Sequence, residues 1–460
     1  MIASSRPAFR LWIFAAACIS LLLILFTFAT DTMRAPLDYA NAKVQDYYNS
    51  TSTSPAEAPT SSAVVVPEVV PEPPEDELET RNCDDPYRQP GWLYVPHDTK
   101  KYRETTWIPY SNDYLNADDP SYAVYPATEE LDFNVTGVEE EFLNMAPQSW
   151  MAKAVAENKR RHKSLREGKR GTPEVDDFVG MKDEGDLGWL WGRRVVMFSD
   201  SVERYMTTFF CEEFGSVISF PVQDVQGRQS VGICEITSFN LTLVYFHSTG
   251  SYTYRPDWWW ISKIKHVAWE DRWDNLWNPR QRPINGPTGK PDLILWQNGF
   301  WDQRAFWEST IAHHKSGQLP KGRQMLWQEV RFVTARLKKI AQRINDEFGE
   351  NTPIMFRSLT THRESGMGDA IIFDHDRISR AIAEQAGHEI FEWGRLITCM
   401  GDLYRDQMHP GKGAASWLWG NMVLEYLARS SASQAYGAAR EPYFDGWSAC
   451  HKDLATWGGR

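Results

Sequence analysis

Two short motifs, far apart in the chain, contain the residue types that nucleophilic catalysis requires. Ser201 follows the apolar run at residues 195–198, and His409 lies near the C-terminal end with Asp406 three residues before it. A serine hydroxyl needs a base to accept its proton and donors to hold the oxyanion that forms on attack. His409 could be that base, with Asp406 orienting it. Taken singly, Ser201 could be a helix N-cap, and Asp406 with His409 an ordinary loop.

A side-chain amide supplies a third element of this chemistry. Asn298 directly follows the apolar run at residues 291–296. An amide at the end of a strand can donate a hydrogen bond to a developing oxyanion, whereas the dipeptide of Asn298 and Gly299 could also be a simple turn. Any one of these motifs could occur by chance at the end of a predicted strand. All three together are much less expected to do so.

Alternating apolar runs and amphipathic stretches indicate the elements that would position these residues. Helices are predicted at 201–214, with Gly215 as the stop, and at 323–348, 374–386 and 414–428; strands are predicted at 195–198, 241–246, 291–296, 353–356 and 388–393. Strands alternating with helices predict an α/β fold with a parallel sheet covered on both faces. Ligands bind such sheets at the carboxyl ends of the strands, where each motif falls.

The N-terminal part of the chain predicts a membrane anchor. Residues 11–30 contain no charge, Arg6 and Arg10 precede them, and the next basic residue is Arg34. This fits a transmembrane signal anchor with a cytosolic tail at 1–10 and the rest of the chain lumenal; a cleaved signal peptide is the alternative. Residues 31–80, rich in Pro, Ser, Thr and Glu, predict a disordered stem.

The remainder divides by composition. Residues 81–187 are predicted to be an irregular lead-in region, 188–432 the catalytic domain and 433–460 a C-terminal tail. A basic stretch at 153–170 suggests a solvated helix or linker. Sequons at Asn49, Asn134 and Asn240 fit a lumenal, glycosylated chain.

An oxidising compartment would allow disulfides. Cys211 and Cys234 are the candidate pair nearest in sequence, but the connectivity stays open, with Cys399 and Cys450 as further candidates.

The formal net charge of −12 argues against nucleic-acid binding. Tryptophans 258–260, 269, 273 and 277 suggest either core packing, which is more common, or a surface for sugar rings. The histidines at 313, 314 and 375 have no coherent ligand set around them, so no metal site is predicted.

The order Ser, Asn, Asp-x-x-His resembles the SGNH (GDSL-type) hydrolase superfamily, and especially its PC-esterase branch with the trichome-birefringence-like polysaccharide O-acetyltransferases. Residues 192–204 with Cys211 look like that branch's Gly-Asp-Ser segment, and residues 291–301 are similar to its Asn-x-Gly-x-Trp segment. The resemblance spans roughly residues 188–430 and implies a three-layer α/β/α sandwich. It also implies Ser201 as nucleophile, His409 as base, Asp406 as its orienter and Asn298 in the oxyanion hole.

The resemblance implies further site residues. Asp200, Arg204, Trp301 and His362 would line the substrate site, and Gly227 would be the second oxyanion donor, with Gly232 and Gly250 as alternatives. Ser199 stands where the family has glycine, a change that could alter the turn.

These features predict a single-pass type II membrane enzyme of the Golgi or secretory pathway that acts on O-acyl esters of a glycan or polysaccharide. It would need no bound cofactor, and an acetyl donor such as acetyl-CoA if it is a transferase. The alternatives are a catalytically inactive glycan-binding or scaffold protein, which Ser199 and the unmatched glycine motivate, and a lipid esterase.

Overall fold

A computed structural model describes residues 85–109, 143–166, 172–223, 229–253, 264–277, 289–314, 323–349, 352–363 and 370–430, all within the unit Leu78–Arg460. The predicted anchor, stem and C-terminal tail lie outside these residues, as do Asn49, Asn134, Gly227, Cys450 and tryptophans 258–260. Within the described part of the chain, no helix is long and apolar enough to cross a membrane.

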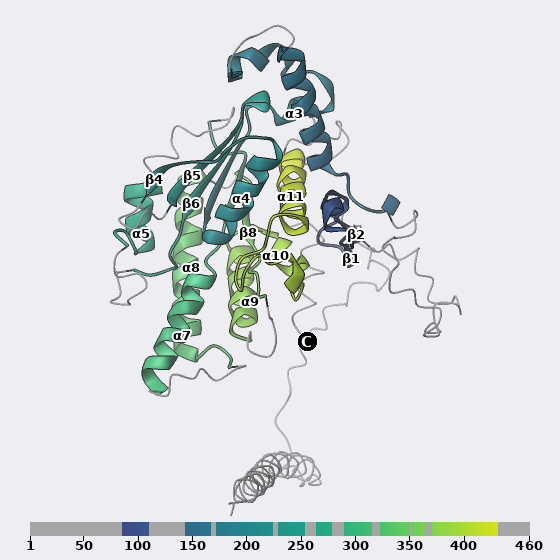
Figure 1. The fold of residues 1–460 in the computed structure, drawn as a ribbon. Coiled ribbons are helices and arrows are strands. Elements are labelled where there is room, and N and C mark those ends of the chain that lie inside the picture. Colours follow the sequence, from purple (N-terminus) through teal and green to yellow (C-terminus); the bar gives the residue numbers. More distant parts are fainter. Residues whose placement is uncertain are drawn as a thin grey trace, which may run out of the picture. The chain divides into compact units, whose positions relative to one another are not determined.

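A seven-stranded, mostly parallel sheet forms the centre of this unit (Figure 1), in the order β4-β5-β6-β3-β7-β8-β9. The central strand β3 (Arg194–Ser199) pairs in parallel with β6 (Leu241–His247) on one side and β7 (Leu293–Trp296) on the other. Parallel pairing continues to β8 (Ile354–Arg357) and β9 (Glu389–Phe391). This sheet confirms the predicted α/β class.

Two strands at one edge depart from the parallel prediction. β5 (Gln229–Ile236) runs antiparallel to both β6 and the edge strand β4 (Ser219–Gln223). The cause is the connection from β5 to β6, the short turn η6 (Thr237–Phe239), because a parallel crossover needs a dozen or more residues. Asn240 ends this turn at a φ of 49°, and its Oδ1 accepts a hydrogen bond from Arg194.

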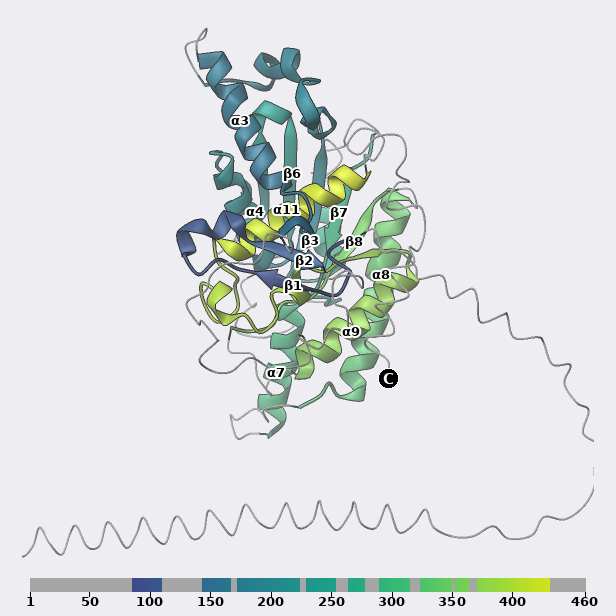
Figure 2. The same cartoon turned by 90° about the vertical axis from the view of Figure 1, so that its right-hand side faces the viewer.

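Successive side chains of β3 point to opposite faces of the sheet, and each face has its own hydrophobic core. Val195 and Met197 pack on one face with α3 (Trp150–Arg166), α4 (Ser201–Glu213) and α11 (Ala414–Ser430). Val196 and Phe198 pack on the other with α8 (Trp327–Phe348) and α9 (Ala370–Gln385). Helices therefore cover both faces of the sheet, as Figure 2 shows.

The tryptophan-rich segment belongs to the second core. Trp269, Trp273 and Trp277, in α5 (Trp269–Arg272) and the π-helical turn η7 (Trp273–Trp277), are at most 2% exposed. Two of these rings pack against Phe198. For these three residues the core interpretation is confirmed and the sugar-binding alternative is wrong.

Most predicted elements of residues 188–430 are present. The four strands β3, β6, β7 and β8 and the helices α4, α8, α9 and α11 lie within a few residues of their predicted bounds. Gly215 and Gly387 follow α4 and α9 with positive φ, as stop positions do. The helix α7 (Phe300–His314), the edge strands β4 and β5 and the short helices α10 (Trp393–Leu396) and η9 (Gly401–Leu403) were not predicted.

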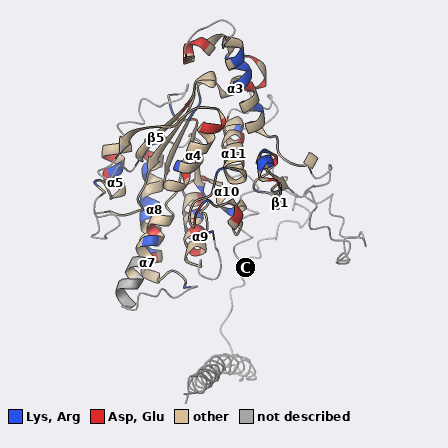
Figure 3. Ribbon diagram, viewed as in Figure 1, with Lys and Arg blue, Asp and Glu red and all other residues tan. Residues whose placement is uncertain are grey.

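The segment before residue 188 packs against the sandwich. A hairpin of β1 (Gly91–Tyr94) and β2 (Thr106–Pro109) encloses η2 (Thr99–Glu104), and η4 (Val175–Met181) and η5 (Gly185–Leu190) precede β3. Trp150 of α3 donates from its indole to Glu425 of α11 at 2.6 Å. In Figure 3, basic residues recur along α3, and Lys153, Lys159 and Arg160 of this helix are exposed, consistent with a solvated outer face.

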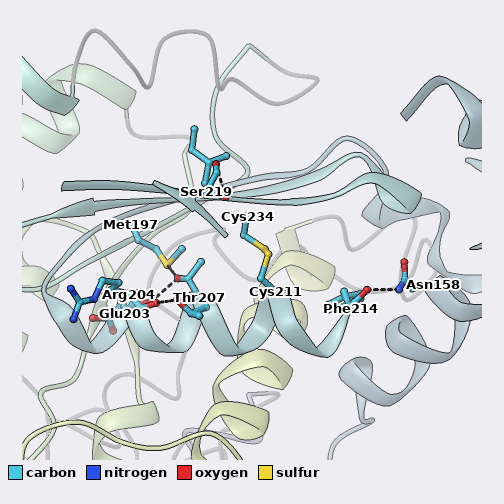
Figure 4. Close-up of a disulfide and its surroundings, with 11 residues drawn as sticks. Asn158, Met197, Glu203, Arg204, Thr207, Cys211, Phe214, Ser219 and Cys234 are labelled. Carbon is cyan, nitrogen blue, oxygen red and sulfur yellow. Dashed lines mark hydrogen bonds between the residues drawn. A yellow bond between two sulfur atoms is a disulfide. The ribbon is translucent and has the colours of Figure 1, made fainter. Parts of the chain in front are cut away.

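A disulfide joins α4 to β5. Cys211 and Cys234 are bonded, with Cα atoms 5.8 Å apart (Figure 4), which confirms the pair nearest in sequence. Cys399 is exposed and has no disulfide partner within the described part of the chain. The bond anchors the helix that begins at Ser201.

Candidate active site

Ser201 is the first residue of α4, immediately after the carboxyl end of β3. The N-cap is Asp200, whose Oδ1 accepts the Val202 N–H at 2.9 Å. Capping is therefore performed by Asp200, and the Ser201 hydroxyl points instead to His409, with Oγ 2.8 Å from Nε2.

His409 is held from its other side by Asp406. Its Nδ1 lies 2.9 and 3.0 Å from the two carboxylate oxygens. A ring nitrogen facing a carboxylate carries its proton, so Nε2 is the acceptor toward Ser201. The Ser201–His409–Asp406 distances are those expected for a catalytic triad, and these three residues are brought together as the sequence predicted.

The loop that carries the triad is folded around the Asp406 carboxylate. The backbone N–H groups of Met408 and His409 both donate to Oδ1 at 2.9 Å. Burial acts to raise the pKa of Asp406, but these two bonds and the His409 ring outweigh it and lower the pKa below its usual range. The carboxylate therefore stays charged and can stabilise an imidazolium.

An aromatic ring supports His409 from the helix side. Tyr205 packs edge-on against the imidazole, with ring centroids 4.9 Å apart. The guanidinium groups of Arg204 and Arg405 lie over the Tyr205 ring, at 4.7 and 4.3 Å from its centroid. Arg204 was predicted to line the substrate site. Its guanidinium packs on Tyr205, the residue whose ring contacts His409.

Asn298 lies just after the carboxyl end of β7, and a hydrogen bond fixes the orientation of its side-chain amide. Its Oδ1 accepts the Ser248 hydroxyl at 2.9 Å, while its Nδ2 is buried and has no hydrogen-bond partner among the described residues. Ser248 follows β6, and β6 and β7 flank β3, so this bond crosses the end of the strand that leads to Ser201. The Nδ2 group is thus a donor that no described residue uses, at the same end of the sheet as Ser201, where an oxyanion donor would be needed.

The glycine predicted as a second oxyanion donor stays a prediction. Gly227 lies outside the described residues, and Gly232 is within β5, facing Phe220. Gly250, in the loop after β6, has a φ of +108°, and a side chain there would meet Asp302. Gly250 was among the predicted alternatives, whereas Ser248 was missed, although Ser-Thr-Gly-Ser shortly after a predicted strand was a readable sign.

Ser199 does not disturb the turn in the way that its replacement of glycine suggested. It is the last residue of β3, and it is not among the described residues with positive φ. A glycine is therefore not required by the backbone here. Ser199 therefore gives no backbone reason to expect a distorted turn before Ser201.

The other predicted lining residues separate into two groups. Asp200 is 2% exposed and serves as the helix cap, and its Oδ2 accepts no hydrogen bond from any residue that the structure describes. His362 and Trp301 are half-buried. The His362 ring stacks on Trp307 with centroids 5.1 Å apart, and Arg363 donates its N–H to the carbonyl of Gln407 in the triad loop at 2.9 Å. His362 and Trp307 thus adjoin the triad loop.

Comparison with known proteins shows remote structural likeness. No family model and no curated protein matches the chain. An acetylxylan esterase from Geobacillus stearothermophilus is 11% identical, with 54% of this chain and 95% of that chain covered and a TM-score of 0.28. A GDSL-like lipase from Bacteroides thetaiotaomicron is 12% identical, with 60% and 99% covered and a TM-score of 0.27. Likeness at this level carries no argument, so the function has to be derived from the residues of this chain.

Proposed function

We propose that this protein is a serine acyl-ester enzyme of the SGNH type, in which Ser201, His409 and Asp406 form the catalytic triad. The observation that carries the proposal is the continuous chain of contacts from Ser201 Oγ to His409 Nε2, at 2.8 Å, and from His409 Nδ1 to Asp406, at 2.9 Å. A helix N-cap or an ordinary loop would require neither contact.

In the first half of the reaction, Ser201 Oγ attacks the carbonyl carbon of the ester while its proton passes to His409 Nε2. The ester C–O bond then breaks, and His409 gives the proton to the leaving alcohol oxygen. The product is an acyl group on Ser201. In the second half, water or a sugar hydroxyl gives its proton to His409 and attacks the acyl carbon, and Ser201 leaves with that proton restored.

The oxyanion of each tetrahedral intermediate would accept hydrogen bonds from two groups. One is the unpartnered Nδ2 of Asn298. The other is the Ser201 backbone N–H, because N–H groups in the first turn of a helix have no partner within the helix. Both are fixed before substrate arrives, so they stabilise charge without reorganisation.

The proposal extends to O-acetyl esters on a glycan. Flat aromatic faces suit sugar rings, and Phe300, Trp307 and His362 form a half-buried aromatic group beside the triad loop. Whether water or a second sugar resolves the acyl-enzyme decides between esterase and O-acetyltransferase. The sequons and the apolar stretch at 11–30 favour a membrane-anchored, lumenal transferase that uses an acetyl donor such as acetyl-CoA.

The direct test is hydrolysis of p-nitrophenyl acetate by the full-length protein and by Ser201→Ala. The proposal expects turnover that Ser201→Ala abolishes. Equal background rates in both proteins would instead support the inactive, glycan-binding alternative. Faster turnover of long acyl chains than of acetate would support the lipid-esterase alternative.

A further inference from the structure

A buried ion pair lies close to the nucleophile in the chain. Glu203, two residues after Ser201, and Arg357, the last residue of β8, have side chains that are 0% and 1% exposed. Arg357 donates to both carboxylate oxygens, from Nε to Oε1 and from Nη2 to Oε2 at 3.1 Å. Burying two charges is costly, and an apolar pair of similar volume is often at least as stable. Stability alone therefore does not account for charges at this place.

The same carboxylate is bonded to the residue that replaces the family's glycine. The Ser199 hydroxyl donates to Glu203 Oε2. Gln297 in turn donates from Nε2 to Ser199 Oγ at 2.8 Å and lies 3.4 Å from Glu203 Oε2. A glycine at position 199 would leave both Gln297 and Glu203 short of a partner.

These bonds join residues of four elements that meet at the carboxyl ends of the central strands. Ser199 ends β3, Glu203 is on α4, Gln297 follows β7 and Arg357 ends β8. Ser201 lies midway between Ser199 and Glu203, and Asn298 follows Gln297. The proposed nucleophile therefore lies within two residues of one buried polar cluster, and the proposed oxyanion amide lies next to a member of the same cluster.

We propose that Ser199, Glu203, Gln297 and Arg357 form a positioning network that sets the Ser201 hydroxyl and the Asn298 amide relative to each other. None of the four touches the reacting atoms; they act through their neighbours. This inference rests on the proposed function. Small displacements of reacting groups can lower rates about 100-fold, so loosening the cluster should reduce turnover more than substrate binding.

The test uses full-length Ser199→Gly, Ser199→Ala and Glu203→Gln. Each is measured for kcat and KM on p-nitrophenyl acetate, for the rate of labelling by a fluorophosphonate, and for its urea midpoint. We expect kcat and the labelling rate to fall about 10- to 100-fold in Glu203→Gln and about 5-fold or more in both Ser199 variants, with KM within about 3-fold. Ser199→Gly is decisive, because a merely tolerated serine predicts equal or higher activity with glycine.

Glu425→Gln is the matched control. Glu425 is a buried carboxylate paired with Arg429 at 2.7 Å on α11, outside the network. It should lose stability as Glu203→Gln does but keep its kcat. Folded Ser199 and Glu203 variants with wild-type kcat would overturn the network while leaving the proposed function intact. If Glu203→Gln does not fold, the two Ser199 variants decide alone. A wild-type protein that reacts with neither ester nor fluorophosphonate contradicts the proposed function and this inference together.

Discussion

The Ser201 hydroxyl and the His409 ring lie 2.8 Å apart although 208 residues separate them in the chain. Ser201 is placed by the turn from β3 to α4, and His409 by a loop folded around Asp406. Two independent local structures therefore converge on one contact. That convergence is what the proposed acyl chemistry depends on.

Replacing Asp406 tests the orienting carboxylate. Asp406→Asn puts an amide where His409 Nδ1 now faces a carboxylate, which disfavours the required tautomer and removes the charge that stabilises the imidazolium. We expect kcat for p-nitrophenyl acetate to fall about 10²- to 10⁴-fold. Asp402→Asn, an exposed residue of the same segment, is the control and should retain full activity. An Asp406→Asn enzyme as fast as the control would remove Asp406 from the mechanism.

The oxyanion donor can be tested separately from the triad. Asn298→Ala removes the unpartnered Nδ2 and should lower kcat about 10²- to 10³-fold with little change in KM. Ser248→Ala leaves the amide but removes the bond that sets its direction, so a smaller loss, about 10-fold, is expected. Equal effects of the two substitutions on KM alone would point to substrate binding instead.

Trp307→Ala tests the glycan subsite. Loss of one aromatic contact should raise KM for an acetylated oligosaccharide about 3- to 10-fold. The KM for p-nitrophenyl acetate, which has no sugar, should not change. Trp92→Ala, which removes an exposed indole from the β1–β2 hairpin, provides a control. Parallel changes for both substrates would argue against a sugar-specific role.

The disulfide between α4 and β5 predicts a stability effect. Cys211→Ala with Cys234→Ala opens a loop with a sequence separation of 23 and should cost about 3 kcal/mol of unfolding free energy. Urea unfolding under non-reducing conditions measures the loss, and a reducing agent should reproduce it in the wild type. Cys399→Ser, at an exposed free thiol, should have no effect. Unchanged stability of the double variant would show that the bond does not form.

Asp302 predicts a pH-dependent stability. Burial raises the pKa of this carboxyl to about 6, against the hydrogen bond that its Oδ1 accepts from the Ser251 N–H. A folded pKa above the unfolded one favours folding at low pH, and this contribution is lost as the pH rises through about 6. Relative to Asp302→Asn, the wild type should therefore lose roughly 2 kcal/mol between pH 4 and about pH 7.

Urea unfolding of both proteins across this range measures the difference. Asp274→Asn, at an exposed carboxylate, should show a flat difference from the wild type. A flat curve for Asp302→Asn as well would mean that Asp302 is not buried as described.

The sequence indicates the central strands and the three residues of the proposed triad, because apolar runs mark buried parallel strands and polar residues at their carboxyl ends gather at one end of the sheet. The sequence does not reveal that β4 and β5 pair antiparallel at one side of the sheet. The turn η6 can be recognised as a tight connection only once β5 and β6 are known to pair. The bond from Glu203 to Arg357 joins residues 154 apart. Nothing local to either residue predicts its partner, so the doubt raised by Ser199 could be resolved only in three dimensions.

The most direct test of the central claim is to trap the acyl-enzyme. Full-length protein would be mixed with p-nitrophenyl acetate, quenched in acid within the first turnover and mapped by peptide mass spectrometry. We predict one acetyl group on Ser201 that is absent from Ser201→Ala. If a more reactive ester acylates His409→Ala, that variant should retain the acetyl group longer. An acetyl group found on another residue, or none during measurable turnover, would contradict it.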